Sequence, residues 1–169
     1  MLAEDEDISI RNDSINKLKK KIAPSIIEIT NENKYYETVE KYSWIYELWR
    51  WADKHNIECI PRNKNKLESL EELDLSNLEL ADIPEELMWL TNLKKISFSN
   101  NCLSEFPYCI LNLENLEILD LSQNNLTEIP DDICYLEKLY SINLNENHFK
   151  KIPDCLKNKI FYQHDMCSE

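Results

Sequence analysis

A fixed period of 23 residues constrains this chain more than any other feature. Leucines recur at that spacing at Leu70, Leu93, Leu116 and Leu139. Neighbouring columns repeat in the same register, and the third unit reads Leu-x-x-Leu-x-Leu-x-x-Asn-x-Leu-x-x-Ile-Pro-x-x-Ile-x-x-Leu. A period of this length indicates a solenoid, in which each unit buries its apolar side chains only against its neighbours.

Within each unit the pattern predicts a short strand followed by a turn and an irregular return. The Leu-x-x-Leu-x-Leu segment alternates with period two, which is typical of a strand with one buried face. The asparagine column (Asn101, Asn124 and Asn147) is expected to turn the chain and to pair buried backbone groups with its amides. The first unit has Leu78 there, as expected of a boundary repeat whose neighbouring turn comes from a cap. The prolines at 84, 107, 130 and 153 restrict the return to extended or 3₁₀ geometry.

The chain contains no glycine, the residue that usually occupies positions of positive φ. We expect asparagine to take most of these positions. The pairs Asn100-Asn101 and Asn124-Asn125 are the candidates, because they stand at the predicted turns.

Outside the repeats, the sequence predicts three further segments. Residues 1–33 are an acidic tail and a short helix, 34–56 a helix that caps the array, and 159–169 a C-terminal tail. The repeats occupy 57–158, as a half repeat and four repeats starting at 70, 93, 116 and 139. The 34–56 helix has a second apolar stripe at Trp44, Leu48 and Trp51, which we expect residues 8–29 to cover. The alternative is that the two tryptophans stay half exposed.

Charge and cysteine content narrow the classes of partner and compartment. The formal net charge of −13 disfavours nucleic acid and anionic membranes and weakly favours a basic protein partner. No leader peptide or membrane-spanning apolar run is visible, so a cytoplasmic location is expected, with secretion into a host cell without a cleavable signal peptide as the alternative. The chain is expected to be a monomer. The cysteines contain no Cys-x-x-Cys pair. Cys109 and Cys155 share a column but lie two repeats apart, and only Cys155 with Cys167 could attempt a disulfide, so a reducing compartment is favoured.

The third-unit pattern quoted above resembles the 23-residue, intracellular class of leucine-rich repeats, over about residues 57–156. The resemblance implies an α/β fold: a short leucine-rich-repeat solenoid with a parallel concave β-sheet, a convex 3₁₀ or irregular side, and an α-helical N-terminal cap. The helical cap and the Asn-, Ile- and Lys-rich composition are also similar to leucine-rich-repeat effectors that bacteria deliver into host cells. Some of these carry a ubiquitin-ligase domain with a Cys-x-Asp motif, which does not occur here.

No residue set in the sequence predicts catalysis, a cofactor or a metal ion. Cys102, Asn125 and His148 share one column, but the Cys and His fall two repeats apart, beyond the reach of a nucleophile and its base. The run from His164 to Cys167 is too small a cluster to predict a metal site. Asp82, Glu105 and Glu128 form an acidic column that Lys151 ends; a solvated face is favoured, with binding of a divalent cation or basic peptide left open.

We therefore expect a non-enzymatic module that binds a protein partner on its concave face. The alternatives are a delivered bacterial effector that binds a host protein, and a non-catalytic subunit or regulator of an enzyme complex. Strand alternation points these residues outward as the candidate site: Glu72, Asp74, Lys95, Ser97, Ile118, Asp120, Ser141 and Asn143, with Tyr140 at the rim. Ile118 is the expected apolar anchor, because its neighbours are polar.

Overall fold

The computed structural model describes residues 32–157, with side chains described from Tyr42 onward. The chain divides into two compact units after Glu47. Helix α2 (Glu32–Lys54) is followed by the short helix α3 (Lys64–Glu68) and the repeats. Helix α2 begins and ends two residues before the segment 34–56 that the sequence predicts as the cap helix.

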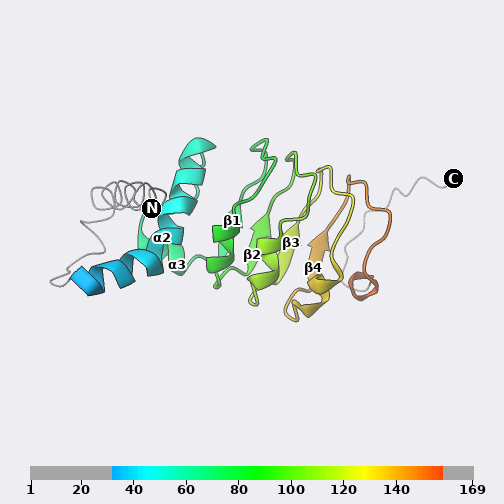
Figure 1. Ribbon diagram of the computed structural model, residues 1–169. Coiled ribbons are helices and arrows are strands. Elements are labelled where there is room, and N and C mark those ends of the chain that lie inside the picture. The colour runs from blue at the N-terminus through cyan, green and yellow to red at the C-terminus, as the bar shows by residue number, and fades with distance from the viewer. Residues whose placement is uncertain (1–31, 158–169) are drawn as a thin grey trace, which may run out of the picture. The chain divides into compact units, whose positions relative to one another are not determined.

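The repeats form a four-stranded parallel sheet in the order β1-β2-β3-β4, as Figure 1 shows. The strands are β1 (Glu72–Asp74), β2 (Lys95–Ser97), β3 (Ile118–Asp120) and β4 (Ser141–Asn143). Each pairs with the next in exact 23-residue register, so that Leu73, Ile96, Leu119 and Ile142 lie side by side in the core. The predicted fold class and register are confirmed.

Four 3₁₀ helices return the chain behind the sheet, as the proline column predicts. They are η1 (Glu85–Trp89), η2 (Tyr108–Asn112), η3 (Asp131–Tyr135) and η4 (Asp154–Leu156). A proline precedes each one as its N-cap residue, with φ between −50° and −75°. Because proline fixes φ in this range and has no N–H to pair, it suits the start of a helical turn.

The asparagine column forms an amide ladder through the buried turns. The side chain of Asn124 is 5 % exposed. Its Nδ2 donates to the carbonyls of Phe98, Leu121 and Ser122 at 2.9–3.1 Å, and its Oδ1 accepts the N–H of Leu103 at 3.0 Å. Since Phe98 and Leu103 belong to the preceding repeat, each asparagine joins two turns.

This reach into the preceding repeat explains Leu78 in the first unit. Asn101 accepts the N–H groups of Leu78 and Leu80 and donates to the carbonyl of Leu75. The turn of the first repeat is therefore served by the amide of the second repeat, rather than by a cap as the sequence suggested.

We predict that Asn124→Ala lowers the free energy of unfolding by about 1–3 kcal/mol, the cost of leaving buried backbone groups unpaired. Asn125→Ala is the matched control, since Asn125 is exposed one residue further on. Urea denaturation of both variants measures the difference, and equal midpoints would contradict the ladder.

The expectation that asparagine takes most positive-φ positions is wrong for half of them in the described chain. Asn56, Asn77 and Asn100 have positive φ, but so do Glu79, Gln123 and Glu146. The repeating position lies one residue before the amide ladder, and Asn125 is not among them. These turn positions are exposed, so a longer side chain can point into solvent there and only the backbone cost of a left-handed residue remains.

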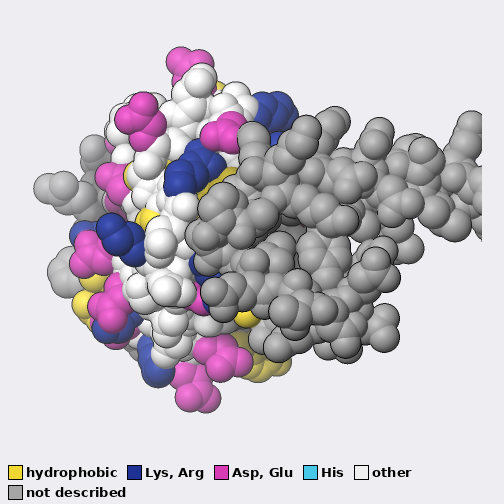
Figure 2. All heavy atoms as spheres, turned by 90° about the vertical axis from the view of Figure 1, so that its left-hand side faces the viewer, with side chains coloured by type: hydrophobic (Ala, Val, Ile, Leu, Met, Phe, Trp, Pro, Cys, Tyr) yellow, Lys and Arg dark blue, Asp and Glu magenta, His cyan; other side chains and the backbone are white. Residues whose placement is uncertain are grey.

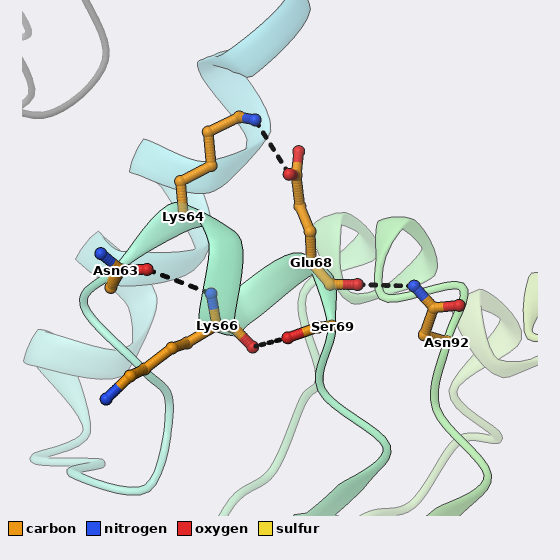
Figure 3. A network of polar contacts seen from close by, with 6 residues as sticks. All are labelled: Asn63, Lys64, Lys66, Glu68, Ser69 and Asn92. Atoms are coloured by element: carbon orange, nitrogen blue, oxygen red, sulfur yellow. Dashed lines mark hydrogen bonds and ion pairs between the residues drawn. The ribbon is translucent and has the colours of Figure 1, made fainter.

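A polar network joins α3 to the first full repeat (Figure 3). Asn63 caps α3 by accepting the N–H of Lys66 at 3.1 Å, and Lys64 pairs with Glu68 at 2.9 Å. Asn92 donates from Nδ2 to the carbonyl of Glu68 at 2.7 Å. Asn115 makes the equivalent bond to the carbonyl of Thr91 one repeat later. These bonds form a second asparagine ladder, which the sequence analysis did not identify.

The last turns of α2 are tied to the loop before α3. Trp49 donates from its indole nitrogen to the carbonyl of Pro61 at 2.9 Å. Arg62 donates to the carbonyl of Trp49 at 2.9 Å and pairs with Asp53 at 2.8 Å. Leu48 and Ala52 on the same turns are fully buried. The predicted covering segment at 8–29 lies outside the described residues.

The prediction of no disulfide within the repeats is wrong. Cys134 in η3 and Cys155 in η4 are bonded, with their Cα atoms 5.8 Å apart. The two cysteines do not share a column of the repeat, because the pair is offset by two positions between adjacent repeats. Because neighbouring repeats stack at about 5 Å, such an offset stays within disulfide reach. Cys155 is therefore not available to Cys167, which lies outside the described residues.

Candidate functional site

The candidate site lies on the outward side of the parallel sheet, which we call the sheet face. It comprises the first and third residues of the four strands: Glu72, Asp74, Lys95, Ser97, Ile118, Asp120, Ser141 and Asn143. All eight point away from the core, because the middle residue of every strand is buried. Strand pairing sorts them into two rows, which begin at Glu72 and at Asp74. The sequence therefore predicted the placement of these residues correctly.

The row that begins at Asp74 is held rigid by local hydrogen bonds. Asp74 accepts the hydroxyl and the backbone N–H of Ser76 at 2.6 and 3.0 Å, and Asp120 does the same with Ser122 at 2.6 and 2.9 Å. Asp120 also accepts Nδ2 of Asn143 at 3.2 Å. The sheet face thus presents fixed carboxylates to a ligand, because these side chains have little rotational freedom left.

Two hydrogen bonds from Ser76, with a smaller contribution from Lys95, lower the pKa of Asp74 below its usual value. Its carboxylate is therefore ionised near neutral pH. Lys95 follows Glu72 in the other row, so this end of the sheet face carries charges of both signs. The charges at this end of the sheet face therefore do not by themselves favour a basic partner, as the net charge of the chain suggested.

Ile118 and Tyr140 are the large apolar side chains of the predicted site. Ile118 is half-buried rather than exposed as the sequence analysis expected, and it stands in the row between Lys95 and Ser141. Tyr140 precedes β4 and is 57 % exposed. Ile118 loses part of its exposure because it sits on an inner strand, with a neighbouring strand on either side.

The column of Cys102, Asn125 and His148 is confirmed as a column. Each residue donates its backbone N–H to a carbonyl 22 residues earlier, at Leu80, Leu103 and Leu126 respectively. Cys102 and His148 are thus two repeats apart, which is unsuited to a nucleophile and base. Among residues 32–157, no group of three or more His, Cys, Asp or Glu side chains could hold a metal ion.

Side chains of both charges mix on one face of the described chain. Figure 2 shows lysine and arginine side chains lying among aspartates and glutamates on the face that it draws. Within the part of the chain that the structure describes, no helix is both long and apolar enough to cross a bilayer.

A groove between η1 and η2, which we call the first groove, is a feature that the sequence analysis did not identify as a cavity. It has a volume of about 620 Å³ and is lined by twelve residues of the first two full repeats, five within 81–88 and seven within 104–112. Cys109 lies in its lining, and burial, the main cause, raises the pKa of this thiol to about 12. The thiol therefore stays neutral and contributes apolar surface. The acidic column of Asp82 and Glu105 is the part of this groove that could be recognised in the sequence.

The comparisons with known proteins agree with the repeat architecture. The Leucine rich repeat family model matches residues 68–126 and 106–149. No curated protein matches the chain in sequence.

Three solved structures illustrate the likeness in fold. An internalin from Listeria monocytogenes has 25 % identity over 59 % of this chain, with a TM-score of 0.51. The BIR3–SERK2 complex of Arabidopsis thaliana has 32 % identity over 59 % and a TM-score of 0.50. The Arabidopsis receptor kinase HAESA, in complex with the peptide hormone IDA and the co-receptor SERK1, has 32 % identity over 57 % and a TM-score of 0.50.

The matched regions cover 30 %, 55 % and 18 % of the chains in those structures, so the chain spans only part of each relative. The likeness concerns the repeats, whose strand order and 3₁₀ returns have just been described. Residues 68–149 are therefore an array of leucine-rich repeats folded as a short α/β solenoid.

Proposed function

We propose that this chain is a non-enzymatic module that binds a protein partner on the sheet face. The observation that carries the proposal is the pair of outward rows along four strands in exact register, of which the row that begins at Asp74 is held by its own hydrogen bonds. A partner meets a surface that is already ordered, so little conformational entropy is lost on binding. Structures similar to this chain, HAESA and the BIR3–SERK2 pair, are themselves complexes.

Ile118 is the proposed anchor of this contact. An apolar side chain that polar groups surround matches the usual anatomy of a binding hot spot, in which the rim excludes water from the centre. Asp120 and Asn143 are joined to one another beside it and supply such a rim. Tyr140 supplies an exposed ring at the edge. Tyrosine is enriched in interfaces because it combines apolar area with a polar tip.

We predict that Ile118→Asp weakens partner binding by about 2 kcal/mol, close to thirtyfold. Affinity purification with mass spectrometry identifies the partner, and calorimetry with the purified partner gives the dissociation constant. Asn125→Asp is the matched control, because it adds the same charge at an exposed position off the sheet face. If Asn125→Asp weakened partner binding more than Ile118→Asp, the binding site would not be on the sheet face.

We also propose that the last turns of α2 cap the N-terminal end of the array. Solenoids need such caps because the end repeat otherwise exposes its apolar core. The bonds from Trp49 and Arg62, together with the burial of Leu48 and Ala52, support this role.

Delivery into a host cell is a second candidate for the setting in which the module works. The Asn-, Ile- and Lys-rich composition of the chain, which is similar to that of bacterial leucine-rich-repeat effectors, supports this candidate. A translocation reporter fused to the full chain, expressed in a bacterium that infects cultured cells, tests the idea; a reporter retained in the bacterium would contradict it.

A further inference from the structure

The first groove, between η1 and η2, carries three carboxylates and no basic side chain. Asp82 and Glu105 come from equivalent positions of neighbouring repeats, and Glu85 begins η1. None of the three forms an ion pair with any residue between 42 and 157. All three are exposed, so their charge is available to a ligand.

The same groove has an apolar floor and an aromatic wall. Phe106 is 5 % exposed and contacts Tyr108 edge to face, with ring centroids 5.7 Å apart at 82°. Tyr108 is 62 % exposed, and Met88 is half-buried in the lining. An exposed aromatic ring beside carboxylates suits a cation on a long apolar stem, because the ring face attracts the charge and the floor covers the stem.

An equivalent groove two repeats later provides an internal comparison. It lies between η3 and η4 and is lined by Glu128 and Asp131, but also by Lys150 and Lys151. Its charges balance, and no aromatic residue lines it. The first groove therefore differs from this one in net charge and in its aromatic wall, although the same repeat geometry builds both.

We propose that the first groove binds a lysine-bearing, extended segment of a partner protein. The lysine stem lies along Phe106 and Met88, and its ammonium group lies among the carboxylates and against the ring of Tyr108. Charge complementarity selects this occupant, because an acidic or neutral segment would leave three neighbouring carboxylates unpaired. The site is separate from the sheet face and does not depend on the function proposed there.

The test uses the full chain and a fluorescein-labelled peptide of six alternating lysine and leucine residues, followed by fluorescence anisotropy at physiological salt. The double variant Glu85→Gln/Glu105→Gln is expected to bind about tenfold more weakly. The matched variant Glu128→Gln/Asp131→Asn removes the same charge from the balanced groove and is expected to change binding by less than about twofold. Tyr108→Leu, which keeps apolar area and removes the ring, is expected to cost about threefold.

Equal weakening by the two double variants would overturn the proposal, since it would mean that only the overall negative charge attracts the peptide. A full chain with serine at Lys19, Lys20 and Lys21 that binds about tenfold more tightly would overturn it as well, because the chain's own lysine run would then compete for the groove. Ile118→Asp is expected to leave peptide binding unchanged, so the outcomes for the groove and the sheet face remain distinguishable. Circular dichroism of each variant verifies the fold.

Discussion

Phe98→Ala is expected to lower the free energy of unfolding by about 3–5 kcal/mol. Phe98 is fully buried and is the largest such side chain in the described core. Truncation removes its transfer free energy and leaves a cavity between stacked repeats, which can collapse only by distorting the register of the sheet. Equilibrium denaturation in urea, followed by circular dichroism, measures the loss.

Phe98→Leu is the control, because leucine occupies this column in the other repeats at Leu75, Leu121 and Leu144. The leucine variant is expected to lose only about 1 kcal/mol, since it keeps most of the buried volume. The two variants also share the backbone carbonyl of Phe98, which accepts from the amides of Asn101 and Asn124. Equal losses in the two variants would show that buried side-chain volume does not govern stability at this position.

The strands were predictable because two independent periods coincide in the repeats. Alternation places Leu119 inward and Ile118 outward, and the 23-residue period then assigns their equivalents in every other strand. A shift of one residue would bury Ile118 with Asp120 and expose Leu119, so only one register is stable. The eight strand positions of the candidate site follow from this register alone.

Contacts that depend on spacing between different columns were not predictable in the same way. The bond from Asn92 to the carbonyl of Glu68 needs the actual path of the loop, which the leucine pattern does not specify. Positive φ at Gln123 and Glu146 contradicts residue preference, because the ladder beside them fixes the turn and overrides the local cost. The first groove likewise arises from two neighbouring returns, and only its acidic column was visible in the sequence.

Loss of the bond between Cys134 and Cys155 is expected to lower the free energy of unfolding by about 3 kcal/mol. The bond closes a loop with a sequence separation of 21 residues, and the chain-entropy relation for a loop of that length gives this magnitude. It also joins η3 to η4, the last two 3₁₀ helices in the part of the chain that the structure describes. Thermal melting of the oxidised chain, with and without a phosphine reductant, measures the effect.

Cys134→Ser should melt at the temperature of the reduced chain and should no longer respond to reductant. Cys102→Ser is the matched control, because Cys102 is an exposed free thiol in the described repeats and its loss should leave the melt and its reductant response intact. Peptide mapping without reduction should recover a linked pair of peptides from η3 and η4; a link from Cys155 to Cys167 instead would contradict the structure.

The same peptide mapping, done after rapid alkylation of thiols in cells, reports whether the chain is in a reducing or an oxidising compartment. Alkylated Cys134 and Cys155 would support the cytoplasmic location expected from the sequence, whereas an intact bond would place the chain in an oxidising environment.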